Sequence, residues 1–160
     1  MFRKSLYLLC MAFFFLLAGK TYSSSFKKVS EGKYTLENDY LKVELNALVG
    51  GGVNNIIYKP REVSLTGVSV STKGGVSFED RVYQQKLKGE SKSIDVEYFS
   101  SRPFEVKVLK DTGKEISVKV SSRGLTDFLS GLQVSKIYTL KDNVPLLFVT
   151  HRMSNTSKSP

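Results

Sequence analysis

The chain has 160 residues, of which 41% are hydrophobic and 24% are charged, and this balance is typical of one globular domain rather than of a disordered chain. Lysine and arginine outnumber aspartate and glutamate by 24 to 15, so the formal net charge is +9. The basic residues are spread singly along alternating segments, as at Lys42, Lys107, Lys119 and Lys136. This spread indicates the solvent-facing side of a sheet, and we expect no nucleic-acid partner.

Residues 1–25 have the layout of a secretory signal peptide. Arg3 and Lys4 precede an apolar run from Leu6 to Gly19, and small polar residues follow. The run is shorter than the roughly 20 apolar residues that a membrane-spanning helix needs. We therefore expect cleavage, no stable membrane anchor, and a periplasmic or secreted product. Cys10 is the only cysteine, so the mature chain would have no thiol for a disulfide, a metal site or a nucleophile.

The first predicted strand covers residues 40–45, where Leu41, Val43 and Leu45 alternate with polar residues and would share one buried face. Three glycines follow at positions 50–52. A phosphate-binding loop would continue into a helix, but the next residues are β-branched and end at a proline. The glycines therefore predict a tight turn or bulge that reverses the strand, with close approach of the backbone to a ligand as the alternative.

Two further hairpins follow. Residues 104–109 and 115–121 alternate around a polar turn that contains Gly113, and residues 132–140 and 145–153 are separated by a turn at 141–143. The residues expected on the inner face of the first hairpin are Phe104, Val106, Val108, Ile116, Val118 and Val120. No segment after residue 25 has helical periodicity, so the pattern predicts an all-β fold, an antiparallel β-sandwich.

Two stretches resemble the galactose-mutarotase-like supersandwich domains. Residues 34–59, "YTLENDYLKVELNALVGGGVNNIIYK", share the Glu-Asn-Asp start, the alternating strand and the Gly-Gly turn of that group. Residues 132–157 share its Lys-x-Tyr-x-Leu strand, Asp-Asn turn and returning strand. The resemblance extends from Tyr34 to Ser157 and corresponds to the N-terminal half of such a domain.

The resemblance implies a carbohydrate-binding sandwich, found in aldose epimerases and as a module of polysaccharide-degrading enzymes. Residues 74–85 are similar to a segment that approaches the binding face in the sugar-active members. Aromatic and planar polar side chains are the groups that hold sugars, and this segment supplies them close together. The predicted carbohydrate-binding residues are Phe78, Asp80, Arg81, Tyr83 and Gln84. The alternative is an ordinary edge strand and loop.

No catalytic acid–base pair is visible, so enzymatic activity stays undecided from the sequence. Epimerases of this group place a histidine and a glutamate beyond the position that corresponds to Pro160, and His151 lies within a predicted strand instead. Glu79 and Asp80 are adjacent and would point to opposite faces of an extended strand. No cofactor or metal is expected. The alternative function is that of the periplasmic supersandwich domain of a membrane-protein insertase, which is not an enzyme.

The predicted domain covers residues 26–160 and is expected to be incomplete at its C-terminal end. The strand at 145–153 carries apolar residues on both faces, so we expect both faces to be packed against other parts of the protein. Leu146 and Phe148 lie on one face, and Leu147, Val149 and Met153 on the other. We expect a segment cut in this way to be marginally stable or to associate through exposed strand edges.

Overall fold

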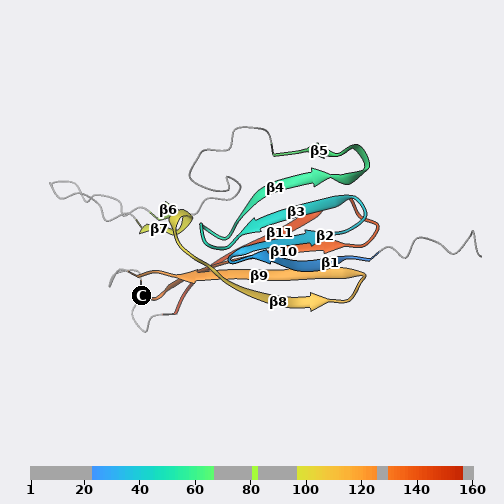
Figure 1. The fold of residues 1–160 in the computed structure, drawn as a ribbon. Coiled ribbons are helices and arrows are strands. Elements are labelled where there is room, and N and C mark those ends of the chain that lie inside the picture. The colour runs from blue at the N-terminus through green and yellow to red at the C-terminus, as the bar shows by residue number, and fades with distance from the viewer. Residues whose placement is uncertain (1–22, 67–80, 83–96, 126–129, 157–160) are drawn as a thin grey trace, which may run out of the picture.

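The computed structural model describes residues 23–66, 81–82, 97–125 and 130–156, which form two antiparallel sheets packed face to face (Figure 1). The first sheet has the order β1-β2-β3-β4-β5, with β1 Ser25–Ser30, β2 Lys33–Glu37, β3 Leu41–Asn46, β4 Gly52–Tyr58 and β5 Val63–Ser64. The second has the order β11-β10-β9-β8, with β8 Glu105–Asp111, β9 Glu115–Arg123, β10 Leu132–Lys141 and β11 Leu147–Asn155. The all-β antiparallel sandwich predicted from the sequence is confirmed.

Short elements complete the described part of the chain. The 3-10 turn η1 Lys59–Arg61 follows β4, and the 3-10 turn η2 Phe99–Ser101 leads toward β8. Two very short strands, β6 Arg81–Val82 and β7 Glu97–Tyr98, pair with each other beside η2. Within the described residues, neither helical segment is long and apolar enough to cross a membrane.

The core lies between the two sheets and is built by the alternation seen in the sequence. Leu41, Val43 and Leu45 of β3 are buried, as predicted, and so are Ile116, Val118 and Val120 of β9. The other members of the buried apolar cluster are Leu36, Val53, Phe99, Phe104, Val134, Tyr138 and Leu140. Each sheet thus contributes one apolar face, and burial of these faces is the main force that holds the sheets together.

The predicted hairpins are confirmed, with one difference at β8. Gly113 has φ +54° in the β8–β9 turn, and β10 pairs with β11 through the turn after Lys141. Val106 is only partly buried, however, and Val108 is 40% exposed. The reason is that β8 is the outermost described strand of its sheet, and a register shift between Val108 and Lys110 also distorts its pairing.

The opposite margin of this sheet is β11, which pairs only with β10 among the described residues. Apolar side chains on both of its faces remain accessible: Phe148 is 42% exposed on one face and Met153 is 47% exposed on the other. Leu146, just before the strand, is 56% exposed. Association through this margin stays a prediction, and these are the side chains that it would cover.

The strands β1 and β2 were not predicted individually from the sequence. They form a hairpin in which Phe26 pairs with Leu36 and Lys28 with Tyr34. The rings of Phe26 and Tyr34 stack with centroids 5.5 Å apart and an interplanar angle of 11°. The alternation of Tyr34 and Leu36 in "KYTLE" is the signal that could have revealed β2, because both side chains pack on the core cluster.

The glycine turn between β3 and β4 is a structural connection between the two sheets. Gly50 and Gly51 have φ values of +71° and +56°, which side-chain-bearing residues rarely adopt. The carbonyl of Gly50 accepts a hydrogen bond from Lys136 Nζ at 3.1 Å, and that of Gly51 accepts one from the Tyr138 hydroxyl at 2.9 Å. The predicted tight turn is therefore confirmed, and β10 of the opposite sheet fixes its geometry.

The solvent-facing position predicted for Lys136 is wrong. Its residue number has the same parity as Val134, Tyr138 and Leu140, so it shares the inner face of β10, and it is only 1% exposed. Besides its bond to Gly50, its Nζ lies 5.4 Å from the centroid of the Phe104 ring. The hydrogen bond and this cation–π contact replace part of the hydration that Lys136 loses on burial.

A second connection between the sheets lies at Asn38, in the turn between β2 and β3. Its Oδ1 accepts the backbone N–H groups of Tyr40 and Leu41 at 2.9 and 2.7 Å. Its Nδ2 donates to the carbonyls of Lys141 and Val144, in the turn between β10 and β11, at 2.7 and 2.9 Å. Asn38 itself is 1% exposed, its bond to Leu41 is buried, and the other three bonds are partly buried.

Candidate functional site

The structure describes only one of the five predicted carbohydrate-binding residues. Arg81 begins β6, where its backbone pairs with Tyr98 of β7. Phe78, Asp80, Tyr83 and Gln84 lie outside the described residues. The pairing of β6 with β7 places this part of the chain beside η2, from which the chain continues into β8 (Figure 1).

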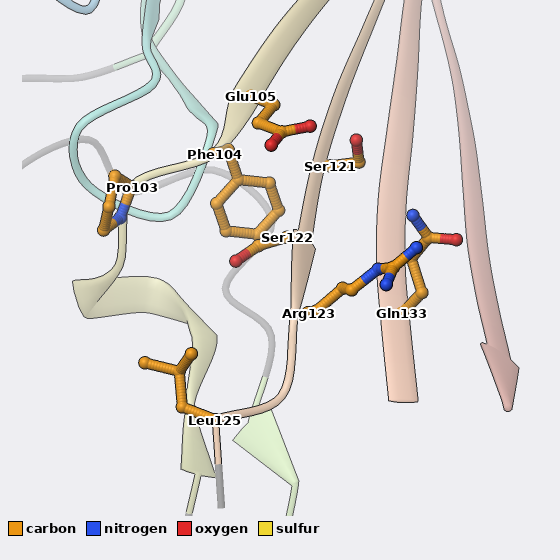
Figure 2. A pocket seen from close by; sticks show the side chains of 8 residues that line it. All are labelled: Pro103, Phe104, Glu105, Ser121, Ser122, Arg123, Leu125 and Gln133. Carbon is orange, nitrogen blue, oxygen red and sulfur yellow. The ribbon is translucent and has the colours of Figure 1, made fainter. Parts of the chain in front are cut away.

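A cavity of about 520 Å³ opens close to this point, at the end of the second sheet (Figure 2). Its size lies within the usual range of small-molecule sites. The residues that line it are Pro103, Phe104, Glu105, Ser121, Ser122, Arg123, Leu125 and Gln133. They come from the start of β8, the end of β9 and the start of β10, so three strands contribute to one site.

The apolar part of the cavity is formed where the chain enters β8. The N–H of Phe104 donates to the Ala47 carbonyl at 2.6 Å, and the N–H of Gly50 donates to the Arg102 carbonyl at 2.7 Å. These bonds hold the segment before β8 against the glycine turn. The Phe104 side chain is only 5% exposed, so it forms a floor, whereas Leu125, at 76% exposed, forms part of the rim.

The polar part is set by the pairing of strands. Glu105 lies opposite Ser121, and Arg123 lies opposite Gln133. Because residues two apart on a strand share a face, Ser121 and Arg123 present their side chains on the same side of β9. Figure 2 shows the Arg123 and Gln133 side chains next to each other, with Glu105 above the Phe104 ring in this view. The cavity thus presents a carboxylate, a guanidinium, an amide and hydroxyls.

Arg102 contacts the backbone of one cavity-lining residue, Arg123. Its guanidinium lies 5.6 Å from the centroid of the Phe99 ring, and its Nη1 donates to the Arg123 carbonyl at 3.4 Å. Burial lowers the pKa of Arg102 from its ordinary value. The side chain of Arg123 itself, by contrast, makes no hydrogen bond or ion pair with any described residue, so its donors are available to a ligand.

The chemistry of this arrangement is that of binding. Glu105 is the only carboxylate among the cavity-lining residues that the structure describes, whereas glycoside hydrolysis requires two. His151 lies on β11, as expected for a strand residue, and does not line the cavity. In the described parts of the chain, no three His, Cys, Asp or Glu side chains are placed to hold a metal ion.

Sequence analysis missed the residues that line this cavity. Glu105 and Ser121 were visible only as polar positions of predicted strands, Arg123 lay beyond the strand predicted at 115–121, and Gln133 was the second residue of a predicted strand. The missing information was the cross-strand register, because it alone puts Glu105 beside Ser121 and Arg123 beside Gln133. That register depends on the β8–β9 turn and on the chain reversal between β9 and β10.

A scan against protein-family models returns no match to the chain, and a search of curated proteins also returns none.

Proposed function

We propose that this chain is an exported carbohydrate-binding domain of the galactose-mutarotase-like type that holds a sugar in the cavity between β8, β9 and β10. The observation that carries the proposal is the composition of the cavity, where planar polar groups of Arg123, Gln133 and Glu105 surround an apolar floor and rim. The resemblance of residues 34–59 and 132–157 to carbohydrate-active sandwiches points in the same direction.

The chemistry of sugars supports this choice of ligand. A pyranose ring has hydroxyl groups around its edge and C–H groups on its faces, so it needs planar donors and acceptors next to apolar surface. Arg123 and Gln133 offer donors, and Glu105 and the Gln133 carbonyl offer acceptors. Pro103 and Leu125 supply apolar contact above the nearly buried Phe104 ring. The described strand β6, which contains Arg81, pairs with β7 and lies beside η2, from which the chain continues toward β8.

Arg123→Ala and Gln133→Ala are each expected to weaken glycan binding by about 5- to 100-fold, which corresponds to roughly 1 to 3 kcal/mol for a lost polar contact. Screening the purified chain on a glycan array identifies a ligand, and isothermal titration of that ligand then compares the variants. Lys33→Ala, at an exposed position of β2 on the other sheet, is the matched control and should bind like the wild type.

Two results would count against the cavity as the sugar site. An array without any signal for the wild type would contradict carbohydrate binding as such. Unchanged affinity in both cavity variants, together with losses in Arg81→Ala and Tyr83→Ala, would move the site to the sequence-predicted segment.

We infer that residues 1–25 direct export and are removed. The basic start and the apolar run that ends before Lys20 carry this inference. Mass spectrometry of protein from the periplasm or medium of a bacterial host should show a mature N-terminus between Lys20 and Phe26. Recovery of the intact chain, beginning at Met1, from the membrane fraction would contradict export by cleavage.

A further inference from the structure

The outer face of the second sheet carries positive charges that no described residue neutralises. Lys107 on β8, Lys119 and Arg123 on β9, and Arg152 on β11 form no ion pair with any described residue. We call these four residues the cationic face. Glu105 is the acidic residue beside them on β8, and it is also unpaired among the described residues.

The register of the strands concentrates these charges. Lys107 lies directly opposite Lys119 in the β8–β9 pairing, and like charges at directly opposite positions destabilise a sheet. Arg152 lies opposite Ser135, which in turn lies opposite Ser121 of the cavity wall. Cationic side chains therefore border the cavity along β8, β9 and β11.

Three other lysines on the described surface form ion pairs, whereas Lys27, Lys28, Lys33 and Lys114 form none with a described residue. Lys110 lies 3.0 Å from Glu115, Lys42 lies 3.2 Å from Glu44, and Lys59 lies 3.4 Å from Glu37. Lys107 and Lys119 differ from the other unpaired lysines because they lie directly opposite each other, on the two strands that lead to the cavity. The facing ammonium groups of Lys107 and Lys119 repel each other, and neither has an acidic partner among the described residues. This arrangement indicates an anionic ligand.

The spacing suits a polymer better than a single sugar. Lys119, Ser121 and Arg123 lie on one side of β9, and at about 3.3 Å per residue the first and last are separated by roughly 13 Å. A chain of sugars that fills the cavity at Arg123 could extend along this row and reach Lys119 and Lys107. Between the cations on β9 lies the partly exposed Ser121, whose hydroxyl suits the hydroxyl groups of a glycan, whereas Ser135 beside it is buried.

We propose that the cationic face binds an acidic polysaccharide, with its carboxylate or sulfate groups on Lys107, Lys119 and Arg152 and a sugar ring in the cavity at Arg123. This proposal rests on the proposed carbohydrate-binding function and names the class of carbohydrate. Glu105 favours a glycan over a nucleic acid, because a glycan presents hydroxyls between its charges that a carboxylate accepts, whereas each nucleotide carries a phosphate. Single-stranded nucleic acids also need exposed aromatic platforms. The described part of this face offers one exposed aromatic side chain for stacking, Phe148, and Lys141 Nζ lies 5.3 Å from its ring centroid.

The test compares matched pairs of polymers. The purified full chain is titrated with polygalacturonate and with fully methyl-esterified polygalacturonate, and in parallel with dextran sulfate and dextran. We expect the acidic member of a pair to bind at least 10-fold more tightly than its neutral partner, with an affinity that falls as salt is raised, because counterions are displaced on binding. Which pair shows the difference distinguishes carboxylate from sulfate as the recognised group.

The variant Lys107→Gln/Lys119→Gln is expected to lose about 10- to 100-fold in affinity for the acidic polymer, through loss of two charge-assisted contacts. Lys27→Gln/Lys33→Gln changes the net charge equally at exposed positions of the first sheet and should retain wild-type affinity. Because the first variant removes a repulsion, its melting temperature should equal or exceed that of the wild type.

The outcomes separate this proposal from the broader one. Equal binding of acidic and neutral polymers, or equal losses in both double variants, would overturn the acidic class and leave carbohydrate binding intact. Absence of binding to every glycan would overturn both. Tighter binding of single-stranded oligo(dT) than of any acidic glycan would replace the polysaccharide by a nucleic acid. A lowered melting temperature of Lys107→Gln/Lys119→Gln would show that these lysines stabilise the fold instead.

Discussion

Gly51→Ala is expected to destabilise the sandwich by about 2 to 5 kcal/mol, from the strain of a left-handed residue and from overpacking. Gly51 has φ +56°, and a Cβ atom added there would lie 2.7 Å from Phe104 Cγ and 2.8 Å from Cδ1. Phe104 cannot move away freely, since its N–H is bonded to the Ala47 carbonyl and Lys136 Nζ lies over its ring. Urea unfolding followed by circular dichroism measures the loss.

Gly113→Ala is the matched control for this substitution. Gly113 has a similar φ of +54°, but an added Cβ atom there would meet only Ser23 Oγ, at 3.6 Å. The control should therefore carry the conformational cost alone, about 1 to 2 kcal/mol. If the two variants lost the same stability, the contact between the glycine turn and Phe104 would contribute nothing. Gly51→Ala should also reduce glycan binding at the cavity, because Phe104 forms its floor.

Asn38→Ala is expected to cost about 2 to 4 kcal/mol of unfolding free energy. The substitution removes four hydrogen bonds, and it leaves the N–H groups of Tyr40 and Leu41 and the carbonyls of Lys141 and Val144 without this partner. Thermal and urea melts of the variant measure the effect. Asp39→Ala, at the neighbouring position, should change stability by less than about 0.5 kcal/mol.

Asn38→Asp separates the two halves of this connection. The aspartate keeps an acceptor for the N–H groups of Tyr40 and Leu41 but loses both donors and places a carboxylate against two carbonyls. It should be at least as destabilising as Asn38→Ala at neutral pH. Stability close to that of the wild type would mean that the bonds to Lys141 and Val144 do not join the two sheets.

The sequence was sufficient to predict the fold class because the inner faces alternate clearly. Leu41, Val43 and Leu45 predicted one buried face, and Ile116, Val118 and Val120 predicted the face that opposes it. Alternation failed at Lys136, where a charged residue occupies an inward position. Its partner, the carbonyl of Gly50, lies 86 residues away in the chain, and no local pattern reveals such a pair.

The candidate site was less predictable than the fold. The predicted segment at 78–84 was chosen for its density of aromatic and planar polar side chains, and Arg81 is the one predicted residue that the structure describes. The cavity, in contrast, is assembled from single residues of three strands. Glu105, Arg123 and Gln133 each look like ordinary surface residues until the strands are paired.

The glycine turn and Asn38 also limit the order in which the sandwich can form as the chain is made. The side chain of Asn38 can complete its hydrogen bonds only when carbonyls 103 and 106 residues further along the chain are in place. The carbonyls of the glycine turn likewise need Lys136 and Tyr138. A chain that emerges from the ribosome with its N-terminus first therefore presents β1 to β5 before the strands that cover them. Contacts of such long separation slow folding, and they leave the apolar face of the first sheet uncovered meanwhile. This interval is when the chain would be most prone to aggregate and would depend most on chaperones.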